Sequence, residues 1–65
     1  MTTYIITELQ NANSYRKGET VEVKNLTAAK RKASRLQMFQ GTVMEIAYQD
    51  GAVVSVKENG KWQDR

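Results

Sequence analysis

The hydrophobic pattern of this chain changes its period twice, and this change limits the folds that the chain can adopt. The segment 19–24 (ETVEVK) alternates polar and apolar residues, which is the two-residue period of a half-buried strand. From position 25 to about position 40 the pattern recurs instead at steps of three and four, which predicts one face of a helix. Short β-branched segments return after Gly41. One helix between strands is therefore expected.

The remaining strands follow from composition and turn signals. Segments 4–9 (YIITEL), 42–48 (TVMEIAY), 52–57 (AVVSVK) and 61–63 (KWQ) are rich in β-branched or aromatic residues. Asp50-Gly51 and Asn59-Gly60 predict tight turns, because glycine tolerates a positive φ. The order is β-β-α-β-β-β. We predict an α+β fold over residues 1–65, a single compact domain whose five-stranded antiparallel sheet carries one helix on a face.

The helix is expected to pack on the sheet through small and apolar side chains. Asn25 or Thr27 can cap its start, and Gly41 is expected just past its end. The residues at core spacing are Leu26, Ala29, Ala33, Leu36 and Gln40. No second layer covers the other side of the sheet, so some of its aromatic and apolar residues should be partly exposed or bound by a partner: Tyr4, Ile6, Tyr48 and Trp62.

Composition excludes several classes of function. The chain has 65 residues and contains no cysteine, histidine or proline, so disulfides, thiolate metal sites and histidine catalysis are not available. Lys30 and Ser34 are four residues apart, but an exposed lysine keeps its proton and cannot activate the serine. We expect a non-enzymatic protein without cofactor or metal. The N-terminus lacks the features of a signal peptide, and no apolar run could span a membrane, which predicts a cytoplasmic protein.

Charge is distributed unevenly along the chain. The net charge is only +3, yet no acidic residue occurs between Glu22 and Glu45. Five cations lie in that gap: Lys24, Lys30, Arg31, Lys32 and Arg35. Solvated helices usually mix charge signs, because Glu–Lys pairs four residues apart stabilise them. The segment 28–37 (AAKRKASRLQ) is therefore interpreted as a binding surface for an anionic partner, and a merely solvated face is the alternative.

Helical geometry separates the two sides of this segment. The outward side carries Thr27, Arg31, Ser34, Arg35 and Met38, while Lys30 and Gln37 lie on one flank and Lys32 on the other. Two kinds of partner fit such a surface. Lysine and arginine on one side suit phosphates, and arginine also forms bidentate pairs with carboxylates. Charge alone leaves both open. Trp62 could stack on bases, but a core anchor is the favoured interpretation.

Three stretches together resemble a known family. They are TYIITELQNANS at the N-terminus, LTAAKRKASRLQMFQGTVMEI across the helix and third strand, and SVKENGKWQD near the end. In this combined order they are similar to the phage-encoded type I-F anti-CRISPR proteins, the family numbered ninth in that series. The similarity covers nearly the whole chain. It implies a five-stranded antiparallel sheet with one helix, in agreement with the order above.

The resemblance also implies a partner and a site. Proteins of this family bind the type I-F CRISPR surveillance complex along its Cas7 backbone subunits and block target DNA from pairing with the guide RNA. The inhibited complex has been linked to non-specific binding of duplex DNA. The family's contacts come from the basic helix and the glutamine after it, positions matched here by Lys30, Arg31, Arg35 and Gln37. Lys32, Ser34, Met38, Lys57 and Lys61 are further candidates for partner or DNA contacts.

Where this family often has lysine, the chain has Arg35, which keeps the charge but changes its geometry. The implied location is the cytoplasm of a bacterial host during phage infection. Two other functions stay open on residues alone. One is a free-standing basic module that binds nucleic acid directly. The other is a small phage structural or regulatory protein whose helix is only solvated.

Overall fold

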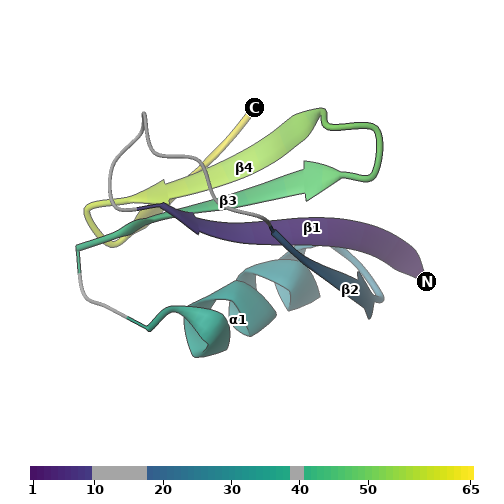
Figure 1. The fold of residues 1–65 in the computed structure, drawn as a ribbon, viewed down its shortest axis with the longest axis horizontal. Coiled ribbons are helices and arrows are strands. Elements are labelled where there is room, and N and C mark those ends of the chain that lie inside the picture. Colours follow the sequence, from purple (N-terminus) through teal and green to yellow (C-terminus); the bar gives the residue numbers. More distant parts are fainter. Residues whose placement is uncertain (10–17, 39–40) are drawn as a thin grey trace.

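The described part of the chain forms one sheet covered on one side by one helix. The computed structural model describes residues 1–9, 18–38 and 41–65. The strands are β1 (Thr2–Leu9), β2 (Glu19–Val23), β3 (Val43–Tyr48), β4 (Val53–Glu58) and β5 (Lys61–Asp64), and helix α1 (Leu26–Leu36) follows β2. Figure 1 shows α1 lying across one side of the sheet. The predicted element order and fold class are confirmed.

All neighbouring strands are antiparallel, in the spatial order β2-β1-β3-β4-β5. Because paired residues share a side of the sheet, the register decides which side chains meet the helix. Ile6 of β1 pairs with Ile46 of β3, and Ile46 pairs with Ser55 of β4. Ser55 in turn pairs with Asp64 of β5. This row crosses four strands on the helix side.

The core lies between that side of the sheet and α1. Ala29 and Ala33 are fully buried, and Leu26 and Leu36 pack beside them, as the helical spacing predicted. The small alanine side chains let the helix axis approach the sheet closely, which suits a domain of this size. The other buried members of the cluster are Tyr4, Ile6, Val21, Met44 and Ile46.

The structure assigns the aromatic residues that the sequence left open. Tyr4 and Ile6 are buried, whereas Tyr48 is 43% exposed and stacks on Tyr4 with ring centroids 5.7 Å apart. Trp62 is half-buried against the core cluster, which supports its interpretation as an anchor. Strand β3 has apolar residues on both sides because Val43 lies opposite Met44 and Ile46 in the alternation.

Both glycine turns form. Asn59 and Gly60 have φ values of +54° and +77°, and they join the paired residues Glu58 and Lys61. Two consecutive positive φ values define a type I′ turn, as the Asn-Gly pair predicted. Gly51, with φ +95°, belongs to a longer connection, in which the Tyr48 amide donates to the Ala52 carbonyl.

A different glycine is required by close approach. A side chain at Gly18 would collide with Ile5 and Thr7 of β1, its Cβ lying 2.5 Å from the Thr7 hydroxyl oxygen. Gly18 therefore lets the chain pass directly against β1 where it enters β2.

The helix is shorter than predicted. Asn25 caps its start by accepting a hydrogen bond of 2.9 Å from the Ala28 amide, which selects Asn25 over Thr27. The expectation that the helix runs to about residue 40 is wrong, since α1 ends at Leu36 and Gln37 is extended. A tertiary contact favours this end: the Glu8 carboxylate accepts the Met38 amide at 3.1 Å, an amide that would donate to the Ser34 carbonyl if the helix continued. The predicted core position Gln40 lies outside the described residues.

Candidate interaction surface on the helix

Three cations point away from the core on α1. Arg31, Lys32 and Arg35 are exposed; Arg31 and Arg35 lie on the side of the helix opposite Ala29 and Ala33, and Lys32 lies on the flank away from Lys30. Within the part of the chain that the structure describes, their side chains form no hydrogen bond or ion pair. We call these three residues the outer basic face. Its guanidinium and ammonium groups are available to a partner.

The end of the helix favours this arrangement. Because α1 stops at Leu36, Arg35 lies in its last turn, where the helix dipole stabilises positive charge. Arg31 lies in the second turn, where repulsion from the N-terminal end of the dipole is weak. The outer basic face therefore strains the helix little.

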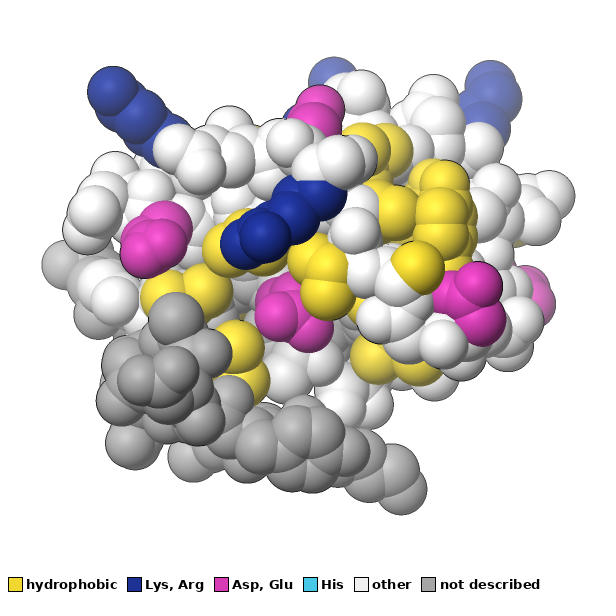
Figure 2. Space-filling model, turned by 90° about the horizontal axis from the view of Figure 1, so that it is seen from above, with side chains coloured by type: hydrophobic (Ala, Val, Ile, Leu, Met, Phe, Trp, Pro, Cys, Tyr) yellow, Lys and Arg dark blue, Asp and Glu magenta, His cyan; other side chains and the backbone are white. Residues whose placement is uncertain are grey.

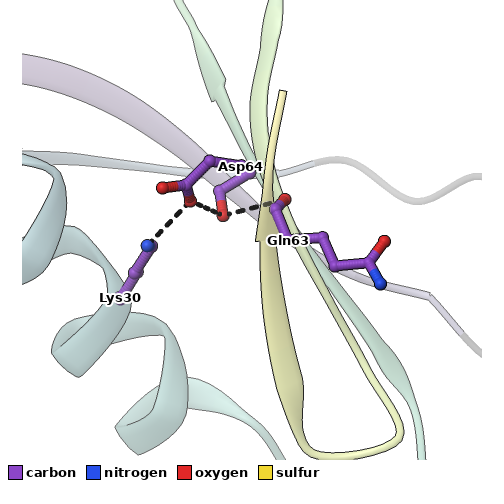
Figure 3. A network of polar contacts seen from close by, with 4 residues as sticks. Lys30, Gln63 and Asp64 are labelled. Carbon is purple, nitrogen blue, oxygen red and sulfur yellow. Dashed lines mark hydrogen bonds and ion pairs between the residues drawn. The ribbon is translucent and has the colours of Figure 1, made fainter.

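Lys30 differs from the other helical cations. Its ammonium forms an ion pair of 2.7 Å with Asp64 of β5, and its side chain is only 24% exposed. Figure 3 shows Lys30 reaching from α1 toward Asp64, whose carboxylate also accepts the Ser55 hydroxyl at 2.8 Å. The hydrogen bond from Lys30, and a second from Ser55, hold the pKa of Asp64 below its ordinary value of 3.8. Lys30 thus already has an anionic partner within the protein.

Gln37 is also engaged internally. Its amide nitrogen donates to the Thr42 carbonyl at 3.2 Å and lies 3.0 Å from the Thr42 hydroxyl. Its amide oxygen accepts from the Lys57 ammonium at 3.3 Å, and that ammonium lies 3.4 Å from the Ser34 hydroxyl. The Thr42 hydroxyl donates to Glu8 at 2.7 Å. Gln37 therefore links the end of the helix to Lys57 of β4 and to Thr42, the residue before β3, and Thr42 in turn contacts Glu8 of β1.

The structure brings most of the predicted site residues together but separates one. Lys57 lies beside Ser34 and Gln37 on the helix side of the sheet, and Met38 is 76% exposed just after the helix. Lys61 pairs with Glu58, one position from Lys57 in the alternation, so it projects from the opposite side of the sheet. A partner seated on α1 alone would not reach Lys61.

The side of the molecule away from α1 has a different character. Figure 2 shows hydrophobic side chains gathered there, with acidic and basic side chains set among them. No concentration of one charge sign comparable to the outer basic face is visible on the described part of that side. The cationic surface is therefore a property of the helix side.

Two contacts within the protein, both made by acidic residues, could not be predicted from the sequence. Asp64 lies 34 positions from Lys30, and Glu8 lies 30 positions from Met38, so no local spacing connects them. A weak signal existed for Asp64, because alternation along KWQD places it on the same side as Trp62. The helical segment contains no acidic residue, so nothing in the sequence indicated that Lys30 pairs with an acid from another element.

Among the described residues there is no group of three or more acidic, histidine or cysteine side chains placed to hold a metal ion. The helix of the described chain is too short and polar to cross a membrane. The fold and this helix therefore define a small α+β protein with a surface of one charge sign, and such a surface attracts anionic groups.

Comparison with known proteins makes this class specific. No family model and no curated protein matches the chain. A solved structure named AcrIF9 matches with 48% sequence identity and a TM-score of 0.91, covering 100% of this chain and 88% of that one. The chain therefore belongs to the AcrIF9 family of type I-F anti-CRISPR proteins. The resemblance inferred from the three sequence stretches is confirmed.

Proposed function

We propose that this protein is a non-catalytic inhibitor of the type I-F CRISPR surveillance complex. In this proposal it docks on the Cas7 backbone subunits through the outer basic face and blocks target DNA from pairing with the guide RNA. Membership of the AcrIF9 family supports an anti-CRISPR function and a type I-F complex as the partner. The Cas7 contact and the steric block are the finer parts of the proposal.

The observation that carries the proposal is the unpaired state of Arg31, Lys32 and Arg35. These side chains are exposed, share one charge sign and have no acidic neighbour on the helix. Two arginines on neighbouring turns can each form bidentate pairs with carboxylates, which gives geometric selectivity as well as affinity. The acidic approaches of a nucleic-acid channel would offer such carboxylates, and the sheet behind α1 would then obstruct the path of the DNA.

The other predicted contact residues take different roles in this proposal. Lys57, placed beside Ser34 by Gln37, extends the surface from α1 onto β4. Met38 offers an exposed apolar group at the same end of the helix. Cations that face away from the bound complex would hold duplex DNA non-specifically, with an affinity that falls steeply as salt rises.

The proposal predicts that Arg31→Glu with Arg35→Glu abolishes inhibition. Four units of charge change on the outer basic face would replace attraction by repulsion. The free energy of unfolding should change by no more than about 0.5 kcal/mol, because both side chains are exposed and unpaired. Binding to the purified surveillance complex by biolayer interferometry, together with urea denaturation, measures both effects.

A matched control is Lys61→Glu with Arg65→Glu, which makes the same change in net charge at the C-terminal end of the chain. This variant should retain binding. If it loses binding as fully as the helix variant, net charge and not the outer basic face drives association. Full inhibition by the helix variant would return α1 to the solvated interpretation.

The second candidate is a free-standing module that binds nucleic acid directly. The same exposed cations favour it, because phosphates are alternative anionic partners. The two functions separate in one experiment, in which the isolated protein is titrated with duplex DNA and with the surveillance complex at moderate salt. Tight binding to DNA without binding to the complex would reject the inhibitor proposal.

A further inference from the structure

The Lys30–Asp64 ion pair lies at the border of the outer basic face. Lys30 is the neighbour of Arg31 in the chain but projects from the flank of α1 that faces β5. Asp64 is held in place by Ser55 as well as by Lys30. The pairing of β4 with β5 sets Ser55 opposite Asp64, and the Ser55 hydroxyl donates to the Asp64 carboxylate. Ser55 is fully buried, so this anchor is fixed.

The consequence for charge is local. Within the described residues this is the one ion pair, and it places a carboxylate 2.7 Å from the ammonium of Lys30. The Asp64 side chain is 60% exposed, so its negative charge also faces any anion that approaches this flank. A phosphate would have to displace the carboxylate or tolerate repulsion from it. The flank is thereby closed to phosphates, whereas Arg31, Lys32 and Arg35 stay open.

We propose that Asp64 is a specificity-determining residue that withholds Lys30 from nucleic-acid phosphates. A phosphate backbone presents charge continuously and would use every cation along the helix, including the flank. A protein partner with a few fixed carboxylates has the three unpaired cations of the outer basic face and loses at most the one predicted contact at Lys30. By neutralising Lys30, Asp64 weakens the first kind of partner more than the second. This inference rests on the proposed use of the outer basic face for binding a protein.

The test measures how salt affects binding of the isolated protein to a short duplex DNA of mixed sequence. The logarithm of the binding constant falls with the logarithm of salt concentration by about 0.9 for each phosphate neutralised. Asp64→Asn should release Lys30 and steepen this slope by about 0.9. The ratio of the DNA-binding constant of the variant to that of the unmodified protein should then fall about 3.5-fold between 50 and 200 mM salt. NMR titration of this small protein measures weak binding and reports folding in the same spectra.

The matched control is Glu22→Gln, which removes one exposed acidic charge from β2, on the side of the sheet opposite α1. It makes the same change in net charge and should leave the slope unchanged. Adding Lys30→Gln to Asp64→Asn should return the slope to that of the unmodified protein. An equal slope for Asp64→Asn and Glu22→Gln would overturn the inference.

A second comparison does not depend on the single variant remaining folded. The double variant Lys30→Gln with Asp64→Asn should bind DNA with the slope of the unmodified protein, because the pair contributes no phosphate contact. Lys32→Gln should lower the slope by about 0.9. If the slope falls as much for the double variant as for Lys32→Gln, Lys30 contacts phosphates in spite of its ion pair with Asp64, and the inference fails. Neither outcome involves the surveillance complex, so failure here is distinguishable from failure of the inhibitor proposal.

Discussion

Gln37 uses both ends of its side-chain amide within the protein. The nitrogen binds Thr42 and the oxygen accepts Lys57, so neither end is free in the unbound state. Family resemblance assigned this glutamine to the partner contacts, and that assignment stays a prediction. The geometry adds a role in the fold, because Gln37 positions the Lys57 ammonium beside α1. A side chain predicted to contact a partner can thus also position a neighbouring residue of the surface, as Gln37 does for Lys57.

Truncation separates these two roles. Gln37→Ala should lower the free energy of unfolding by about 1–2 kcal/mol, since it removes several partly buried hydrogen bonds. Urea denaturation measures this change. Gln63→Ala, the same substitution at an exposed position of β5, should change the free energy of unfolding by less than about 0.5 kcal/mol. If Gln37→Ala abolished complex binding without a loss of stability, Gln37 would be a contact only.

At the scale of elements, α1 has one end set locally and one end set by the fold. Asn25 caps the start from three residues away, a pattern that is visible in the sequence. The other end depends on Glu8 of β1, whose carboxylate accepts the Met38 amide. Without that contact, helix-forming residues after Leu36 would favour continuation, as the sequence predicted. The ion pair between Lys30 and Asp64 is a third link, and it ties the middle of α1 to β5.

The link between α1 and β5 should depend on pH. The pKa of Asp64 is lowered in the folded protein, so its ionised form is stabilised by folding. This contribution is complete above the unfolded value of 3.8 and is lost as pH falls through the lower folded value. Thermal denaturation at pH 7 should therefore give a higher Tm for the unmodified protein than for Asp64→Asn.

That difference in Tm should disappear once the pH lies well below 3.8. Both proteins share every other acidic group, so general acid destabilisation cancels in the comparison. A difference that persisted unchanged at the lower pH would mean that Asp64 stabilises the strand by some means other than its charge.

At the scale of the whole molecule, one small core supports the surface. A 65-residue domain has a total stability of only about 3–10 kcal/mol at typical values per residue. Ile46 is fully buried at the centre of the sheet, between Ile6 and Ser55 and beneath α1. The outer basic face therefore depends on a core with little stability in reserve.

Ile46→Ala should cost about 2–5 kcal/mol, because it leaves a cavity where the helix meets the sheet. A loss of that size is comparable to the whole stability, so a large fraction of the variant should be unfolded at 37 °C. Circular dichroism during heating measures this. Val56→Ala, at a half-buried position on the opposite side of the sheet, should lower Tm by less.

The sequence by itself determined the element order, the core side of α1, the Asn-Gly turn and the cluster of helical cations. These features depend on residues close together in the chain, where periodicity, capping and turn chemistry act. Family membership also followed from the sequence, because several stretches in order identify a family better than any single motif. The sequence could not determine where α1 ends or which cations are free.

Only the tertiary structure decided these points. Glu8 ends the helix, Asp64 neutralises Lys30, Gln37 positions Lys57, and strand register sends Lys61 to the other side. Each depends on residues from separate elements that come together only when the strands pair. Local sequence sets which side chains a face carries, and the packed sheet sets which of their charges are already satisfied. The outer basic face is what remains after that pairing.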